Sequence, residues 1–152
     1  MSNYDHNNDE ARLILPGLQS LYSALSPLVV LYMRVIAGIA FMAHGWPKMA
    51  TLPTGPVGMV EGLGFPAAGL FAPLLALTEF VGGALLVAGL LTRPVALAQS
   101  FVLLVTVYAH WIAWDEGYSE SEKSLLWLGL MLYFAVHGAG RFSVDRVIGK
   151  QF

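Results

Sequence analysis

The sequence predicts an all-α membrane protein: an antiparallel bundle of four transmembrane helices, preceded by a short N-terminal interfacial helix. The first observation behind this prediction is composition. Of 152 residues, 57% are hydrophobic and only 12% are charged, whereas soluble domains carry roughly 25% charged residues. The mean hydropathy is +0.65. The second observation is that long apolar stretches recur along the chain with short connections between them, which is typical of an antiparallel helix bundle.

Composition also excludes several classes of function. The formal net charge is −2 and no basic run is present, so no nucleic-acid partner is expected. The chain has no cysteine, which excludes disulfides, thiolate metal sites and a thiol redox relay. It also has no haem or flavin motif. The acidic, polar start differs from a signal peptide, so we expect the chain to enter the membrane uncleaved.

The N-terminal region, residues 1–26, is predicted to be a polar tail followed by the interfacial helix. Apolar residues recur there at helical spacing between Pro16 and Pro27, over a stretch too short to cross a bilayer. Residues 27–139 form the predicted four-helix transmembrane domain. Its spans are expected at about residues 27–45, 66–91, 95–114 and 124–136.

The connections between the spans follow from helix-breaking and polar residues. Pro47 is expected to stop the first helix. The segment 49–65, rich in proline and glycine, is expected to be a loop with one short helical turn. The residues at positions 92–94 are expected to form a tight turn, and residues 115–123 an acidic loop.

The distribution of basic residues predicts the orientation. Five lie in the N-terminal tail, the second loop and the C-terminal tail, and two lie on the other side: Arg12, Arg93, Arg141, Arg146 and Lys150 against Lys48 and Lys123. The positive-inside rule then places both termini in the cytoplasm, with residues 140–152 as a cytoplasmic tail. We expect a multi-pass protein of the bacterial inner membrane.

A single carboxylate, Glu79, lies in the middle of the apolar segment 70–90. An ionisable group near the bilayer midplane costs roughly 2.5 kcal/mol or more unless it is paired, hydrated or protonated. Arg34, in the first apolar run, is the predicted partner. A rise of 1.5 Å per residue puts Glu79 about 8 Å further from the cytoplasmic end, within reach of an extended arginine. We therefore expect the bundle to be organised around an Arg34–Glu79 ion pair.

Both predicted partners share helix faces with small residues, which allow helix backbones to approach closely in lipid. Arg34 lies on one stripe with Gly38, Phe41 and Gly45, and Glu79 lies on another with Ala68, Ala72 and Gly83. Both charged residues are therefore expected to face other helices.

Further polar residues predict a pocket that opens toward the outer face, with Glu79 as its floor. His44 and His110 are expected at similar depth in the first and third spans, and Thr106 shares a helix face with His110 and Gln99. Aromatic residues crowd the same boundary and form the expected walls: Trp46, Trp111, Trp114 and Tyr118.

Simpler interpretations of these residues stay open. The Arg34–Glu79 pair could only set helix register, and the two histidines could be interfacial side chains bonded to backbone or headgroups. The tryptophans could form an ordinary aromatic belt. Two histidines and Glu79 could chemically hold a metal ion, but no HxxH or ExxH spacing supports one, so no metal is predicted.

The chain resembles the DoxX family of small four-helix bacterial membrane proteins. The first matching pattern is R-x-x-x-G-x-x-F-x-x-H-G-x-x-K, made here by Arg34, Gly38, Phe41, His44, Gly45 and Lys48. The second comprises the residues Gly64 to Pro66 and, further on, E-x-x-G-G-x-L-L-x-x-G-L-L-T-R from Glu79 to Arg93. The closing G-x-G-R-x-S-x-D-R runs from Gly138 to Arg146. The resemblance implies a four-helix fold and, in some relatives, a role in thiosulfate:quinone oxidoreductases or as a partner of soluble enzymes in oxidative-stress defence.

The first hypothesis is therefore a quinone-interacting redox subunit. Glu79, Arg34 and His110 are the predicted catalytic residues, and His44, Lys48, Thr106 and Trp111 are predicted to bind the quinone or substrate. A histidine donates to the headgroup, Glu79 relays a proton, and Arg34 balances the charge of Glu79. Lys48 is the nearest cation to receive thiosulfate, the substrate that the resemblance suggests. Electrons come from such a substrate or from a soluble or membrane redox partner.

The second hypothesis is a non-catalytic membrane anchor or assembly subunit for a soluble redox or stress-defence partner. Here the buried charges set helix register, and the acidic outer loop or the basic C-terminal tail docks the partner. A transporter is a third hypothesis. Four helices have no evident inverted repeat, so this hypothesis requires the protein to assemble as a homo-oligomer.

Overall fold

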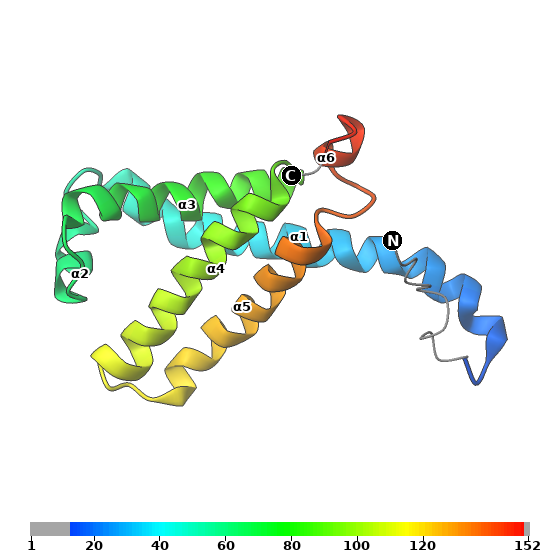
Figure 1. Cartoon of the computed structure of the whole chain (residues 1–152), viewed down its shortest axis with the longest axis horizontal. Coiled ribbons are helices and arrows are strands. Elements are labelled where there is room, and N and C mark those ends of the chain that lie inside the picture. Colours follow the sequence, from blue (N-terminus) through cyan, green and yellow to red (C-terminus); the bar gives the residue numbers. More distant parts are fainter. Residues whose placement is uncertain (1–12, 151–152) are drawn as a thin grey trace, which may run out of the picture.

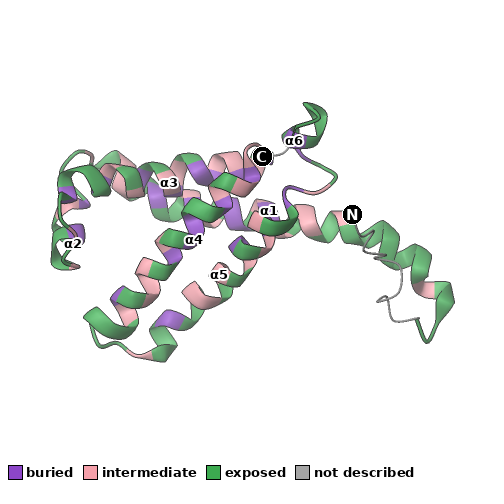
Figure 2. Cartoon of the chain, viewed as in Figure 1, coloured by how far each residue is buried: buried purple, intermediate pink, exposed green. Residues whose placement is uncertain are grey.

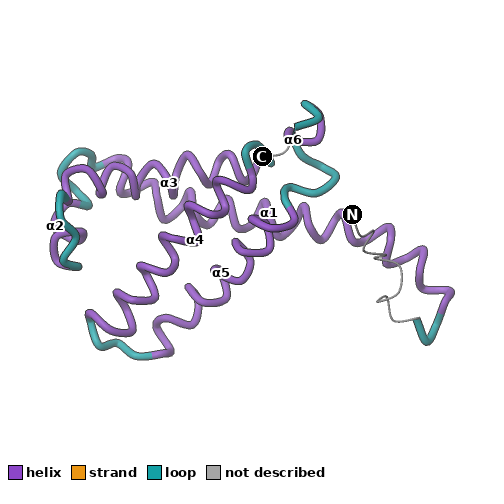
Figure 3. The backbone as a smooth tube through the Cα atoms, in the orientation of Figure 1, coloured by secondary structure: helices purple, strands orange, loops and turns teal. Residues whose placement is uncertain are grey.

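The computed structural model of the chain describes residues 13–150. All regular secondary structure in this range is helical (Figures 1 and 3). A single 3₁₀ turn, η1 (Pro16–Leu18), precedes α1 (Gln19–Ala50); α2 (Val57–Gly62) and α3 (Ala68–Ala88) follow, then α4 (Thr92–Tyr108) with the π-helical turn η2 (Ala109–Ala113), α5 (Tyr118–His137) and α6 (Val144–Val147). Residues 1–12, where the polar tail is predicted, lie outside the described residues.

The four long helices form two antiparallel pairs. The helix α1 packs mainly against α3, and α4 packs mainly against α5. The pairs meet near the α3–α4 turn and diverge toward the α2 end of α3, so that the molecule has the outline of a V (Figure 1).

Three of the described helical segments are long and apolar enough to cross a membrane: Pro16–Ala50, Ala68–Ala88 and Thr92–Ala113. The fourth long helix, α5, differs because Glu120, Glu122 and Lys123 lie in its first two turns. These charges lower its hydropathy and leave an apolar stretch from Ser124 onward.

The contact between α1 and α3 depends on glycine. A Cβ atom on Gly38 would lie 2.6 Å from the carbonyl oxygen of Gly83, and a Cβ atom on Gly83 would lie 2.6 Å from the carbonyl oxygen of Gly38. Further along, a Cβ atom on Gly45 would lie 2.5 Å from the backbone nitrogen of Phe80. The glycines of the stripes predicted from the sequence therefore lie where these helices touch. Ala68 and Ala72, predicted on the stripe of Glu79, instead pack in a cluster with Val60 of α2.

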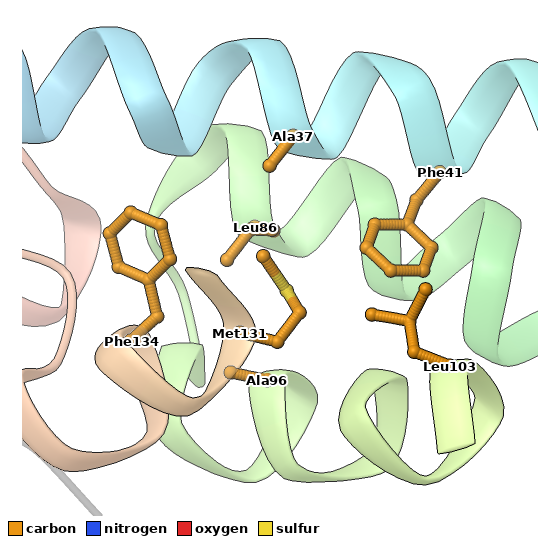
Figure 4. Packing of buried hydrophobic residues seen from close by; sticks show 7 residues of the cluster. All are labelled: Ala37, Phe41, Leu86, Ala96, Leu103, Met131 and Phe134. Carbon is orange, nitrogen blue, oxygen red and sulfur yellow. The ribbon is translucent and has the colours of Figure 1, made fainter. Parts of the chain in front are cut away.

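Where the two pairs meet, all four long helices contribute to one apolar core. It contains Ala37 and Phe41 from α1, Leu86 from α3, Ala96 and Leu103 from α4, and Met131 and Phe134 from α5 (Figure 4). Most side chains that face away from this core are exposed, as Figure 2 shows for the outer surfaces of the helices. In a membrane protein these outward apolar faces are the ones that contact lipid.

The separate N-terminal interfacial helix is not confirmed. The structure has one continuous helix from Gln19 to Ala50, with Pro27 and Pro47 inside it. A proline removes one backbone hydrogen bond and bends a helix, and transmembrane helices tolerate this because the surrounding protein compensates. Neither proline therefore ends α1.

The turn between α3 and α4 also differs from the prediction at residues 92–94. The chain reverses at Gly89 and Leu91, whose φ angles are +70° and +53°, and Thr92 already begins α4. Pro94 lies in the first turn of α4, where a backbone N–H would have no intrahelical acceptor in any case. Residues 92–94 thus begin α4 and do not form the turn.

Replacing Gly83 with alanine is expected to lower the stability by about 1–3 kcal/mol, because the added methyl group would meet the backbone of α1. The control is Gly129→Ala on α5, where an added Cβ meets nothing within 4 Å and alanine should stabilise the helix by roughly 0.5–1 kcal/mol. Thermal unfolding in mild detergent should show shifts of opposite sign. Equal shifts would contradict the close α1–α3 contact.

Candidate functional site

A large cavity lies between the two helix pairs, with a volume of about 810 Å³. The residues that line it come from α1, α2, α3, α4, η2 and α5. Most are apolar or aromatic, and a small set of polar side chains lies among them: His44, Lys48, Thr78, Glu79, Thr106, His110, Glu120, Lys123 and Ser124. Ligand sites typically combine an apolar cavity of this size with a few such polar groups.

The carboxylate of Glu79 is paired with Lys48 in this cavity. The Nζ atom of Lys48 lies 2.5 Å from Oε2 of Glu79 and 3.3 Å from the carbonyl oxygen of His44. The Glu79 side chain is 9% exposed and that of Lys48 is 23% exposed. Gly45 allows this pairing, because a Cβ atom there would lie 2.8 Å from the Cβ atom of Glu79. The predicted Arg34–Glu79 pair is therefore wrong.

His44 lines the cavity on α1, one turn before Lys48. Its Nδ1 atom lies 2.8 Å from the carbonyl oxygen of Ala40. A carbonyl can only accept, so Nδ1 carries the proton in this contact, and Nε2 of the neutral ring is left as an acceptor. Neutral His44 can thus accept a hydrogen bond from a ligand hydroxyl.

On the opposite wall, Thr106 and His110 line the cavity from α4 and η2. Nδ1 of His110 lies in hydrogen-bonding contact with a carboxylate oxygen of Glu116, and the His110 ring lies edge-on to Trp114 at 4.9 Å between centroids. Gln99, predicted on the same polar face, lies deeper, where it is fully buried and its Nε2 atom is 3.5 Å from the Thr78 carbonyl oxygen. The predicted polar face thus divides between the core and the cavity.

The aromatic walls differ in part from the prediction. Trp111 does not line the cavity and packs instead on Tyr118, at 5.6 Å between ring centroids. The π-helical turn that contains both His110 and Trp111 changes the register expected from a regular α-helix. Trp114 and Trp127 line the cavity, and Trp127 lies edge-on to Phe41 at 6.2 Å.

Sequence reasoning missed the contribution of α5. Glu120, Lys123, Ser124 and Trp127 all line the cavity. Their spacing of three, four and seven residues puts them on one face of a helix, and this pattern could have identified them. The prediction treated residues 115–123 as a loop, whereas α5 begins at Tyr118.

Arg34 lies outside the cavity, at the end of the molecule where the pairs meet. It is 1% exposed, and its Nη2 atom donates to the carbonyl oxygen of Phe142 at 2.5 Å. Gly89 faces the guanidinium group so closely that a Cβ atom there would overlap Nη1. Along α1, Arg34 is eleven residues before Gly45, about 16 Å at the helical rise, so Arg34 and Glu79 lie at different levels of the bundle.

The segment around α6 holds the chain near Arg34. The carboxylate of Asp145 accepts hydrogen bonds from the backbone nitrogens of Leu91 at 2.8 Å and Thr92 at 3.1 Å, at the start of α4. The backbone nitrogen of Asp145 donates to the carbonyl oxygen of Gly89 at 2.9 Å. Asp145 also interacts electrostatically with Arg34. We call Arg34, Phe142 and Asp145 the C-terminal clasp, because they join α1 and the C-terminal segment to the α3–α4 turn.

Within residues 13–150, no three His, Asp or Glu side chains converge as potential ligands of a metal ion. His44 and His110 lie on different walls and bond to Ala40 and Glu116, while Glu79 is paired with Lys48.

Residues 13–150 are all-helical in their regular structure and include three helices suited to crossing a bilayer, which is the arrangement of an integral membrane protein. The sequence profile of the DoxX family matches residues 29–111. This chain belongs to the DoxX family.

Curated relatives match over most of their length. "Inner membrane protein YqjF" of Escherichia coli K12 is 33% identical over 130 residues, which cover 84% of this chain and 98% of the relative. "Uncharacterized membrane protein Rv3486" of Mycobacterium tuberculosis H37Rv is 29% identical over 150 residues, 90% of this chain and 91% of the relative. "Inner membrane protein YphA" of Escherichia coli K12 is 29% identical, with 82% and 94% covered. No solved structure matches.

Proposed function

We propose that this DoxX-family protein binds a quinone headgroup in the cavity between its helix pairs and serves as the quinone-interacting subunit of a membrane redox system. The observation that carries this proposal is the Lys48–Glu79 pair in the wall of a cavity that is otherwise mainly apolar and aromatic. A quinone needs an apolar slot, hydrogen-bonding groups for its two carbonyl oxygens and a route for protons. The cavity contains side chains suited to each requirement.

The charge balance of the site favours a neutral ligand. Lys48 and Glu79 neutralise each other, so a quinone or quinol adds no unpaired charge. An anion such as thiosulfate would compete with Glu79 for Lys48. Lys123, on the α5 wall, forms no ion pair among residues 13–150 and is the better candidate to attract an anionic reductant.

Proton transfer would use two side chains on the α1–α3 side of the cavity. Reduction of a quinone to a quinol takes up two electrons and two protons. Neutral His44 is suited to accept a hydrogen bond from a quinol hydroxyl through Nε2, and Glu79 is suited to exchange a proton with the ligand because its carboxylate lines the cavity. The electrons would come from a partner redox protein or from a reduced sulfur compound at the opening of the cavity.

The proposal includes the orientation of the helices in the membrane. The three apolar helices and α5 cross the bacterial inner membrane, with the termini in the cytoplasm and the charged start of α5 at the outer surface. A helix of 32 residues is about 48 Å long, longer than the hydrocarbon core of roughly 30 Å. The N-terminal turns of α1 would therefore extend into the cytoplasmic interface.

The test is the quinone content of protein purified in mild detergent. Wild type should retain about one quinone per chain, and Glu79→Gln should lower the affinity by about tenfold or more. Glu79 holds Lys48 Nζ, the charged donor available to a quinone carbonyl, and hydrogen bonds to a charged group contribute roughly 1.5–3 kcal/mol. Glu61→Gln is the matched control, since Glu61 is an exposed carboxylate on α2 that does not line the cavity.

Folding of the Glu79→Gln variant is checked by its elution as a single species and by its helical circular dichroism. Retention of quinone by wild type and Glu61→Gln alone would support the proposal. Absence of quinone from all three proteins, with no binding on titration, would favour the alternative: a non-catalytic anchor for a soluble partner.

A further inference from the structure

A second, smaller hollow adjoins the cavity on the outer surface of α4. It is an open groove of about 430 Å³ between α4 and the segment that connects α2 to α3. The residues that line it are Leu63, Gly64, Phe65, Pro66, Phe101, Leu104, Val105 and Tyr108. Tyr108 is the only one of them that carries a polar side-chain group.

The groove and the cavity share part of their walls. Leu63, Phe65, Phe101 and Val105 line both. The remaining groove residues face outward: Leu104 is 53% exposed and Tyr108 is 45% exposed. The groove therefore extends from the wall of the cavity to the surface of the protein that contacts lipid.

We propose that this groove holds the hydrocarbon tail of the ligand whose headgroup occupies the cavity, and that the ligand enters sideways from the bilayer. This inference rests on the proposed quinone site and defines its ligand as a tailed, membrane-dissolved quinone. The apolar lining suits a hydrocarbon chain, and the shared wall connects that chain to a headgroup beside Lys48 and Glu79. Leu63 and Phe65 on one side and Phe101 and Val105 on the other flank the passage.

Affinity is a poor test of this arrangement. A hydrocarbon tail is already in an apolar medium when it is dissolved in lipid, so its transfer into an apolar groove yields little hydrophobic free energy. The position of the tail is the informative quantity. The experiment therefore uses two photoreactive quinones in the purified full-length protein, one with a diazirine on the tail and one with an azide on the headgroup.

We expect the tail probe to label Leu104, Tyr108 and the segment 63–66, and the headgroup probe to label residues of the cavity, as identified by mass spectrometry of peptides. An excess of an unlabelled short-chain quinone should suppress both patterns, because the two ends belong to one bound molecule.

Leu104→Trp should lower the tail labelling of the groove by about tenfold, equivalent to roughly 1.4 kcal/mol, because the larger ring fills the groove. Leu97→Trp is the matched control: Leu97 lies on the same helix, is 58% exposed and lines neither hollow. If Leu104→Trp does not fold, Leu104→Ala serves instead, and it should shift the tail labelling toward the neighbouring Phe101 and Tyr108.

The outcomes separate the two proposals. In one outcome, an unlabelled quinone suppresses headgroup labelling in the cavity, but tail labelling is spread over lipid-facing residues such as Leu97. This result would overturn the groove inference and leave the quinone site standing. Tail labelling of the groove that an unlabelled quinone does not reduce, and that a diazirine phospholipid reproduces, would assign the groove to membrane lipid and also overturn the inference. If neither probe gives labelling that an unlabelled quinone suppresses, the quinone site itself is refuted.

Discussion

Replacing Lys48 with methionine is expected to lower the free energy of unfolding by about 2–3 kcal/mol, because the Glu79 carboxylate is then buried without its counter-charge. This is less than the roughly 3–5 kcal/mol typical of fully buried pairs, since the Lys48 side chain is 23% exposed. At about 2–4 °C per kcal/mol for a chain of this size, the midpoint of thermal unfolding in detergent should fall by about 4–12 °C.

A second substitution tests the cause of this loss. The double variant Lys48→Met, Glu79→Met should regain most of the stability, because apolar residues can replace a buried ion pair at little cost. Lys123→Met is the control, since Lys123 is an exposed lysine of the same cavity, and its effect should stay within about 0.5 kcal/mol. Equal destabilisation of the single and double variants would show that Lys48 does not act through Glu79.

Replacing Asp145 with alanine is expected to destabilise the protein by about 2–4 kcal/mol. The substitution removes the acceptor for the first backbone nitrogens of α4, a capping loss of roughly 1 kcal/mol. It also removes a negative charge that acts on the buried guanidinium of Arg34. The midpoint of thermal unfolding should fall, and the amides of Leu91 and Thr92 should exchange with deuterium faster than in wild type.

The control for Asp145 is Arg146→Ala, the neighbouring residue on α6, which is exposed. Its effect on stability should be within about 0.5 kcal/mol. Unchanged exchange at Leu91 and Thr92 in Asp145→Ala would contradict the C-terminal clasp, even if the variant were less stable. Faster exchange confined to these amides and to the C-terminal segment would support it.

Local patterns in the sequence correctly indicated an all-helical fold in the described residues and glycines at which two of the helices touch. Gly38, Phe41 and Gly45 are all buried, because residues three and four positions apart share a helix face whatever the rest of the chain does. The family resemblance, carried by residues from Arg34 to Arg146, is likewise a property of the sequence, and the family match over residues 29–111 confirms it.

The partner of Glu79 could not be predicted in the same way. The depth estimate started the first helix at Pro27 and assumed that both helices crossed the bilayer in a common register. The close approach of Gly45 to Phe80 places Glu79 beside the C-terminal part of α1, near Lys48. Arg34 is partnered instead by a segment more than 100 residues further along the chain, at Phe142. No local periodicity reports a contact of that separation.

The amino-acid sequence by itself determined the class of this protein, its family, the apolar helices and the presence of ionisable groups that the bundle must accommodate, because these depend on composition and on spacing within one helix. Only the tertiary structure decided which groups meet. The register of α1 on α3 pairs Glu79 with Lys48, the divergence of the helix pairs opens the cavity, and the returning C-terminal segment contacts Arg34. Each of these depends on how helices pack against one another, and backbone approach at glycines such as Gly38, Gly45 and Gly83 sets that packing.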